Sequence, residues 1–235
     1  MFEPERRGEV CRLGSPGARW LVTGPEGGYR GADAAYNVSV PQGFDREDPA
    51  AYAAECRRAA GFEAPGPGLL TGVDMHHARG ARTDGVCVVA TAGLSNPVAL
   101  AGSEAVGGDT DSPDAGGPDT GAGPGTVNLL VGTDRALADG TLATLLATVV
   151  ETKAGTLQAV TGFTGTTTDA VAVGCDPGGD PVAFAGSATA VGRATRVCVR
   201  RAVEAAVEAR GSVPDSVAGA EHGAVPAAAP DVFCL

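Results

Sequence analysis

The sequence GPGTVNLLVGTD, residues 123–134, places a hydroxyl at the start of an apolar run. Glycine and proline residues, which favour turns, stand immediately before Thr126, and Asn128 lies inside the run. An apolar run of this length predicts a buried strand. Thr126 therefore has two interpretations. It closes a turn that leads into the strand, or it is displayed at the strand end because it takes part in chemistry.

Similar apolar runs recur along the chain and predict further strands. Many of them are continuous rather than alternating, which indicates sheets that are covered on both faces. The predicted strands are residues 18–24, 35–40, 68–73, 86–92, 126–133, 169–175 and 182–187.

Three helices are predicted, over residues 48–60, 140–160 and 190–209. Asp48 as the N-cap residue and Pro49 at the first helical position mark the start of the first helix. Asp139 is the predicted N-cap of the second helix, in which apolar residues recur at i, i+3 and i+4.

These elements predict an α+β fold, a layered sandwich of mixed sheets with long helices outside. Residues 1–210 are expected to form a single domain. Residues 102–125 are acidic and rich in glycine and proline, which predicts a flexible surface loop. Residues 211–235 are rich in alanine and proline and are expected to form a loosely held tail.

The charge balance excludes several partners. The chain has 17 basic and 28 acidic residues, a net charge of −11, which argues against binding to nucleic acid or an anionic membrane. Lys153 is the single lysine, and the other basic residues are arginine. An acidic, lysine-poor surface suits a cytosol of very high salt, where screening removes self-repulsion, so a halophilic source is predicted. The alternative is a GC-rich genome that replaced lysine by arginine.

The cysteines and the chain start predict a cytoplasmic protein. None of the six cysteines forms a CxxC pair and several lie in apolar runs, which favours buried free thiols. The first ten residues lack the apolar core of a signal peptide, and no apolar run approaches the ~20 residues that span a bilayer.

Lys153 is the most informative single residue. At 100° per residue it lies in the middle of the apolar stripe of the second predicted helix, whereas Glu151 points to the opposite side. One interpretation is snorkelling, with the stem buried and the ammonium at the edge of the core. The other is a desolvated ammonium that tunes a nucleophile or holds an anion.

Two strand ends carry short polar side chains. TAGLSNP, residues 91–97, offers Thr91, Ser95 and Asn96, which suit either an oxyanion site or a turn with an Asx-type hydrogen bond. In the second, residues 164–170, threonines that include Thr166 and Thr168 precede Asp169. Hydroxyl-rich loops of this kind bind polar ligands, but they also cap strands.

No metal or cofactor is predicted. His76 and His77 are adjacent, and adjacent side chains diverge on a helix or a strand, so they are not expected to share an ion. Neither the G-x-G-x-x-G pattern of dinucleotide-binding folds nor a P-loop is present.

Together these segments resemble the adenosylcobinamide amidohydrolase family. The resemblance covers roughly residues 20–209 and leaves out the acidic loop and the tail. One departure is Glu-Thr-Lys at 151–153, where Glu-Ala-Lys is expected, although Glu151 and Lys153 are retained. The matching segments are TAGLSNP (91–97), GTVNLLVGTD (125–134), ETKAGTLQ (151–158), TGTTTDAVAVGC (164–175 in outline) and AGSATAVGRATRVCVRRAV (185–203).

This resemblance implies hydrolysis of the amide that joins a corrin propionate to aminopropanol in adenosylcobinamide. The products are adenosylcobyric acid and 1-aminopropan-2-ol, formed during cobamide salvage. The corrinoid is then a small-molecule substrate rather than a cofactor. The chain could also assemble with copies of itself as a homo-oligomer.

A second, weaker resemblance concerns mechanism. The 125–134 segment, followed by a long helix and a Thr/Asp-rich strand start, is similar to the nucleophile strand of DmpA-type aminopeptidases and ornithine acetyltransferases. Those proteins cleave themselves before a serine or threonine and have an αββα fold, and the residue at that position here is Thr126. This is an analogy between folds and does not by itself establish function.

The resulting hypothesis assigns a role to each group. Thr126 attacks the amide carbonyl, Lys153 tunes it or balances charge, and Asn96 or Asn128 steadies the oxyanion. Asp169 and the threonines at 166–168 contact the corrin amides. The rival is attack by water with Glu151 or Asp169 as general base. A self-processing aminopeptidase or acyltransferase and a non-catalytic corrinoid-binding protein are the alternative functions.

Overall fold

The computed structural model describes most of the chain. The described residues are 1–25, 27–100, 125–211, 213–217, 219–220, 223–225 and 230–234. The predicted acidic loop lies outside them except for Gly125. Among the described residues, no helix combines the length and hydrophobicity needed to cross a membrane.

A six-stranded mixed sheet carries the strand that follows Thr126. That strand, β10, pairs parallel with β13 and antiparallel with β8, and all of its residues are buried. The strand order is β4 (Gly28–Gly31), β3 (Arg19–Val22), β13 (Val171–Cys175), β10 (Val127–Thr133), β8 (Val86–Ala92) and β7 (Arg79–Thr83).

A second, four-stranded sheet packs against the first. It is also mixed, because β5 and β6 are parallel whereas the other neighbours are antiparallel. Its strand order is β1 (Glu3–Arg7), β2 (Val10–Gly14), β5 (Ala34–Ser39) and β6 (Gly68–Thr71). Two short pairs complete the strands: β11 (Ala136–Leu137) with β14 (Pro181–Val182), and β12 (Gly165–Thr166) with β9 (Pro97–Val98).

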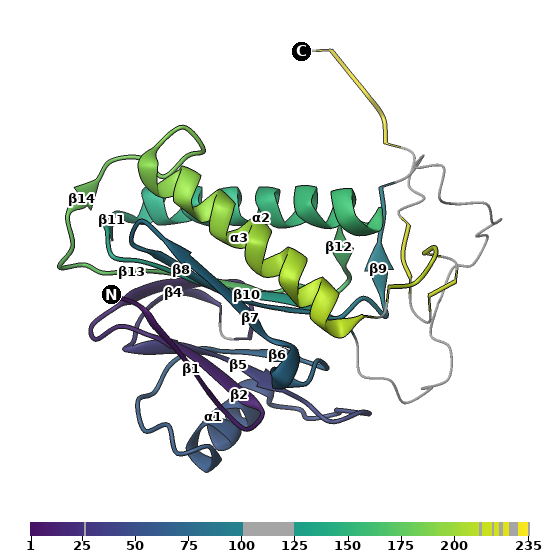
Figure 1. Cartoon of the computed structure of the whole chain (residues 1–235), viewed down its shortest axis with the longest axis horizontal. Coiled ribbons are helices and arrows are strands. Elements are labelled where there is room, and N and C mark those ends of the chain that lie inside the picture. Colours follow the sequence, from purple (N-terminus) through teal and green to yellow (C-terminus); the bar gives the residue numbers. More distant parts are fainter. Residues whose placement is uncertain are drawn as a thin grey trace.

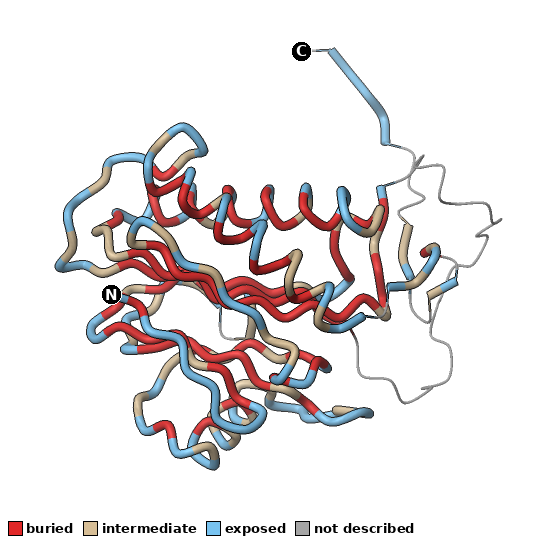
Figure 2. Tube along the Cα trace, in the orientation of Figure 1, coloured by how far each residue is buried: buried red, intermediate tan, exposed pale blue. Residues whose placement is uncertain are grey.

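The elements form four layers, which confirms the predicted α+β class with mixed sheets and helices outside. Helix α1 (Pro49–Ala59) covers the small sheet, the two sheets face each other, and α2 (Asp139–Thr161) and α3 (Ala190–Arg210) cover the large sheet (Figure 1). Buried residues concentrate in the facing sheets and along α2 and α3 (Figure 2). Continuous apolar strands are required because both faces of the large sheet are covered.

Alternation along β10 decides which side chains enter which layer. Leu129 and Val131 pack with α2 and α3, whereas Leu130 packs between the two sheets with Trp20. Successive side chains of a strand point to opposite faces. Thr126 and Asn128 share the parity of Leu130, so both face the small sheet.

The predicted helices are present, with one correction at a cap. Asp48 caps α1, because its Oδ1 accepts a hydrogen bond of 2.9 Å from the Ala51 N–H. The N-cap of α2 is Ala138 rather than Asp139, which occupies the first helical turn and pairs with Arg19. A carboxylate in that turn favours the positive end of the helix dipole, so the residue stabilises the same terminus by another means.

Strand prediction failed in one apolar run and missed several strands. Of the predicted strand 182–187, only Val182 is in a strand, β14 (Pro181–Val182). The residues that follow it lead into α3. Of the unpredicted strands, β1, β4 and β7 are edge strands with charged or glycine-rich sequences, whereas β2 is an interior strand whose residues are mostly buried. Polar edges protect a sheet from further pairing, and they carry no hydrophobic period.

Part of the predicted loose tail is packed against the domain. Val217 is buried beside Ala99 and Phe163, and Ala224 forms a parallel bridge with Val98. Gly211 in the left-handed conformation (φ 69°) ends α3 and turns the chain back toward β9. Val217 and Ala224 therefore attach this part of the segment to the domain, whereas residues 230–234 are exposed.

Four of the six cysteines are buried, as predicted for free thiols in apolar runs. Burial raises the pKa of Cys11 and Cys198 to about 11, so these thiols stay protonated at neutral pH. Cys56 is half-buried and Cys234 is exposed.

Candidate active site

Thr126 immediately precedes the first residue of β10, faces the small sheet and is 4% exposed. Its hydroxyl donates a 2.6 Å hydrogen bond to the Thr71 hydroxyl, at the end of β6 in the small sheet. Thr71 Oγ1 also accepts a hydrogen bond of 3.2 Å from the Val73 N–H. Thr71 was missed by sequence reasoning, because a threonine ending an apolar strand gives no signal of what faces it.

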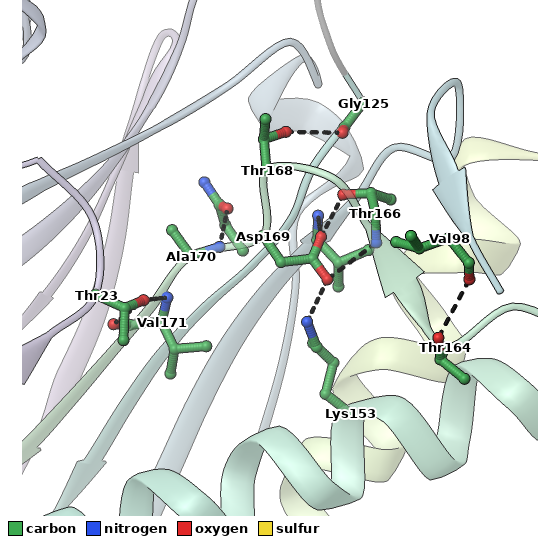
Figure 3. A network of polar contacts seen from close by, with 12 residues as sticks. Thr23, Val98, Gly125, Lys153, Thr164, Thr166, Thr168, Asp169, Ala170 and Val171 are labelled. Carbon is green, nitrogen blue, oxygen red and sulfur yellow. Dashed lines mark hydrogen bonds and ion pairs between the residues drawn. The ribbon is translucent and has the colours of Figure 1, made fainter. Parts of the chain in front are cut away.

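Asp169 is the centre of a polar cluster (Figure 3), and one of its donors is the N–H of Val127, the residue that follows Thr126. Its Oδ1 accepts from the Thr166 hydroxyl and, at 2.8 Å, from the Val127 N–H. Its Oδ2 accepts from the Lys153 ammonium and, at 3.1 Å, from the Thr166 N–H. A carboxylate has about four acceptor positions, so all of them are occupied.

Lys153 reaches this cluster from α2. Its side chain is 7% exposed and that of Asp169 is 11% exposed, so the two form a buried ion pair. A buried pair is costly to desolvate and is retained only when its other hydrogen bonds are satisfied. The prediction that Lys153 faces the core is confirmed. The ammonium contacts Asp169 rather than Thr126.

Gly125 is held on both of its polar backbone groups. Its N–H donates to Ser95 Oγ at 2.8 Å, and its carbonyl accepts from the Thr168 hydroxyl at 3.3 Å. A Cβ at this position would lie 2.6 Å from both the backbone nitrogen and Oγ of Ser95, so only glycine fits. The structure thus brings together Ser95, Thr168 and the peptide bond that precedes Thr126.

The hydrogen bonds of Ser95 and Thr168 to Gly125 form a clamp on that residue. Asn96, which follows Ser95 in the chain, is 1% exposed. Its Nδ2 donates to the hydroxyls of Thr167, at 2.5 Å, and Thr168, at 3.5 Å. Its Oδ1 has no hydrogen-bond partner among the described residues. To act as an oxyanion donor, as predicted, Asn96 would have to leave these threonines.

Thr91 and Asn128 belong to a different network, deeper between the sheets. Asn128 Nδ2 donates to Asn37 Oδ1 at 3.0 Å and to the Leu70 carbonyl at 2.8 Å, and its Oδ1 accepts from the Ala170 N–H. Asn37 in turn donates to the Thr91 hydroxyl at 2.9 Å. Thr91 and Asn128 are fully buried and line none of the cavities found among the described residues.

A cavity of about 420 Å³ opens onto the cluster, and Thr71, Thr126, Thr168 and Asp169 form its polar side. The rest of its wall is mainly apolar and includes Phe44. Such a cavity, apolar with a few convergent polar groups, is typical of small-molecule sites.

Comparison with known proteins assigns the family. Residues 6–214 match the family model of adenosylcobinamide amidohydrolases (CbiZ). This chain belongs to the adenosylcobinamide amidohydrolase family. An adenosylcobinamide amidohydrolase of Halobacterium salinarum is 50% identical over 229 residues, 95% of each chain. Another, of Methanosarcina mazei, is 28% identical over 201 residues, 81% of this chain and 90% of the relative.

Membership confirms the resemblance read from the sequence motifs and the enzyme class, an amidohydrolase acting on a carbon–nitrogen bond. Similarity to a Halobacterium protein also agrees with the halophilic interpretation of the acidic, lysine-poor composition.

Glu151, like Thr91 and Asn128, is a predicted site residue that the structure places away from the Thr126 cavity. It lies on the exposed face of α2, where its carboxylate pairs with Arg196 of α3 at 2.9 Å and its side chain is 65% exposed. Lys153 lies on the buried face, two residues on. Helical geometry thus separates two residues that the Glu-Thr-Lys motif places together in sequence.

The histidine pair differs from expectation in geometry. His76 and His77 lie on a 3-10 turn (Met75–His77), with ring centroids 3.7 Å apart, and ligand atoms of both lie within 4.8 Å of one another and of an Asp74 oxygen. The expected divergence was wrong, because it assumed an α-helix or a strand.

Proposed function

We propose that this chain hydrolyses the amide that joins aminopropanol to the corrin propionate of adenosylcobinamide. Water is consumed, and adenosylcobyric acid and 1-aminopropan-2-ol are released, a reaction of cobamide salvage. The observation that carries the proposal is 50% identity over 95% of the chain to a protein named for this activity. The cavity at Thr126, about 420 Å³, has room for the aminopropanol arm, while the corrin ring stays outside.

Thr126 is the proposed nucleophile, and its surroundings restrict how it is activated. Among the described residues, its hydroxyl has one side-chain partner, Thr71, which is not a base. The Asp169 carboxylate is occupied by four donors, one of which is Lys153. A threonine needs a base to become a nucleophile. The remaining candidate for this base is the α-amine of Thr126 itself, which is freed when the preceding peptide bond is cut.

The clamp on Gly125 supports such a cut. In this step the Thr126 hydroxyl attacks the Gly125 carbonyl carbon, the C–N bond breaks, and the freed amine takes up the proton. Water then hydrolyses the resulting ester. The Thr168 hydroxyl, which already donates to the Gly125 carbonyl, would stabilise the oxyanion that forms. In the mature site the amine of Thr126 would deprotonate its own hydroxyl for attack on the substrate amide.

The finer fold assignment also belongs to this proposal. Layers in the order helix, sheet, sheet, helices, with the nucleophile at the end of a central strand, support the likeness to the αββα fold of DmpA-type aminopeptidases and ornithine acetyltransferases. Lys153 then acts as a positioning residue. It holds Asp169, and Asp169 holds the N–H of Val127, next to the nucleophile.

The substrate is tested by incubating the purified protein with adenosylcobinamide in molar potassium chloride and detecting products by mass spectrometry. Aminopropanol and adenosylcobyric acid in equal amounts are expected. Corrinoid binding without release would favour a carrier, and hydrolysis of small peptide amides with none of adenosylcobinamide would favour an aminopeptidase. Either result contradicts the proposal.

Self-cleavage is tested separately by the intact mass of the protein. Two fragments that divide between Gly125 and Thr126 are expected from the wild-type chain. A single full-length mass in a preparation of full activity would rule out the α-amine as the base.

A further inference from the structure

A second cavity, of about 260 Å³, is lined by Gly125, whereas Thr126 lines the first cavity. Gly125 and Ser95 form part of its inner wall, and Gly72 lines both this cavity and the one that contains Thr126. The described residues that line it are Gly72, Val73, Gly93, Leu94, Ser95, Gly125, Arg210, Val213, Pro214, Gly219 and Ala220. The two cavities are therefore neighbours, because Gly72 lines both and the consecutive residues Gly125 and Thr126 line one each.

The outer wall is the C-terminal segment, which we define as residues 213–217, 219–220 and 223–225. This wall is fixed. Val217 is 5% exposed beside Phe163, and the Ala224 N–H donates to the Pro97 carbonyl at 3.0 Å. A Cβ on Gly223 would lie 2.1 Å from the Val217 carbonyl oxygen, so the segment is also closely folded on itself. Most of it lies beyond residue 214, where the match to the family model ends.

The chemistry of the lining restricts the ligand. Among the described residues, Arg210 is the one charged side chain that lines the cavity, so a cationic group is disfavoured. Glycine backbone and the Ser95 hydroxyl offer hydrogen bonds, while Val73, Leu94 and Val213 offer apolar contact. A short aliphatic arm that ends in a neutral carboxamide satisfies both, and a cavity of 260 Å³ has room for an arm but not a macrocycle.

We propose that this cavity is a second corrinoid subsite, which takes a neutral carboxamide arm of the ring while the scissile arm lies at Thr126. The C-terminal segment is its outer wall and contributes to substrate specificity. Corrin rings carry several such arms, so one substrate occupies both cavities at once. This inference rests on the proposed function, because it takes the same substrate.

The test is to fill the cavity from its outer wall. Ala220→Trp places a large ring in the subsite, whereas Asp215→Trp places the same ring on an exposed position of the same segment that does not line the cavity. For Ala220→Trp the KM for adenosylcobinamide should rise about tenfold or more, with kcat within about twofold of wild type. Asp215→Trp should match wild type in both constants. An unchanged KM in a folded Ala220→Trp protein would overturn the inference.

Two further measurements keep the test decisive. Val213→Trp fills the same cavity from another position, and it should raise KM in the same way if Ala220→Trp fails to fold. Equilibrium binding of adenosylcobinamide to the same variants should weaken in parallel with KM, and it applies even if the wild-type chain releases no aminopropanol. Absent turnover with binding weakened by the fillers would count against the proposed function alone, whereas binding that ignores both fillers would count against the subsite.

Discussion

Two buried polar networks lie on the same side of β10, yet they have different surroundings. The Asn128, Asn37 and Thr91 network is closed, because each of its groups is buried and bonded to another across the two sheets. The cluster of Thr126 and Asp169 forms a wall of a cavity. Thr126 precedes Asn128 by two residues, so the two side chains point to the same face of the sheet. Buried polar residues must find partners in either case. Access to a cavity, rather than polarity, separates the candidate site from a structural network.

Loss of the ion pair between Lys153 and Asp169 should have the largest effect. Lys153→Met leaves the Asp169 carboxylate buried without its cation, which should destabilise the protein by about 3–5 kcal/mol. It should also lower kcat by about 100-fold or more, because the Val127 N–H loses a fixed acceptor beside Thr126. Chemical denaturation and steady-state kinetics in molar salt measure the two effects.

The matched control is the double variant Lys153→Met with Asp169→Asn. Removal of both charges should restore part of the stability without restoring activity. Recovery of activity in the double variant would show that the pair has only a structural role.

Thr91→Val should have the opposite profile. It removes the acceptor of the Asn37 amide in the closed network and should cost about 1–3 kcal/mol of stability. The kcat of the folded protein should stay within about twofold of wild type, because this network does not reach the cavity. A large fall in kcat at full occupancy of the folded state would place Thr91 in the site after all.

Glu151→Gln should have the smallest effect. The ion pair with Arg196 is largely exposed and screened by salt, so its loss should change stability by less than about 0.5 kcal/mol. Activity should be unchanged. A strong loss of kcat would revive attack by water with Glu151 as general base.

The parts of this structure that could be predicted are those that a single segment determines. The apolar run 86–92 is a strand as expected, and Lys153 on an apolar stripe is buried. What Lys153 contacts could not be read in the same way, because its partner Asp169 follows a separate turn and strand. Thr71 was missed for the same reason: its role depends on how two sheets face each other.

Composition misled the prediction in the C-terminal segment. Alanine, glycine and proline suggested a loose tail, yet Val217 and Ala224 attach it to the domain through one apolar cluster and one bridge. Asn37, within the apolar strand 35–40, was not singled out, although its position gave a signal. An amide in a buried strand requires partners, and these were found in the facing sheet.

The most direct measurement of the central claim compares wild type, Thr126→Ser and Thr126→Ala in one assay of aminopropanol release from adenosylcobinamide. If Thr126 is the nucleophile, Thr126→Ala should lose at least about 1,000-fold in kcat with its fold intact, and Thr126→Ser should retain measurable turnover. Substantial activity in the folded Thr126→Ala protein would contradict the account and leave Thr126 as the residue that joins a turn to a strand.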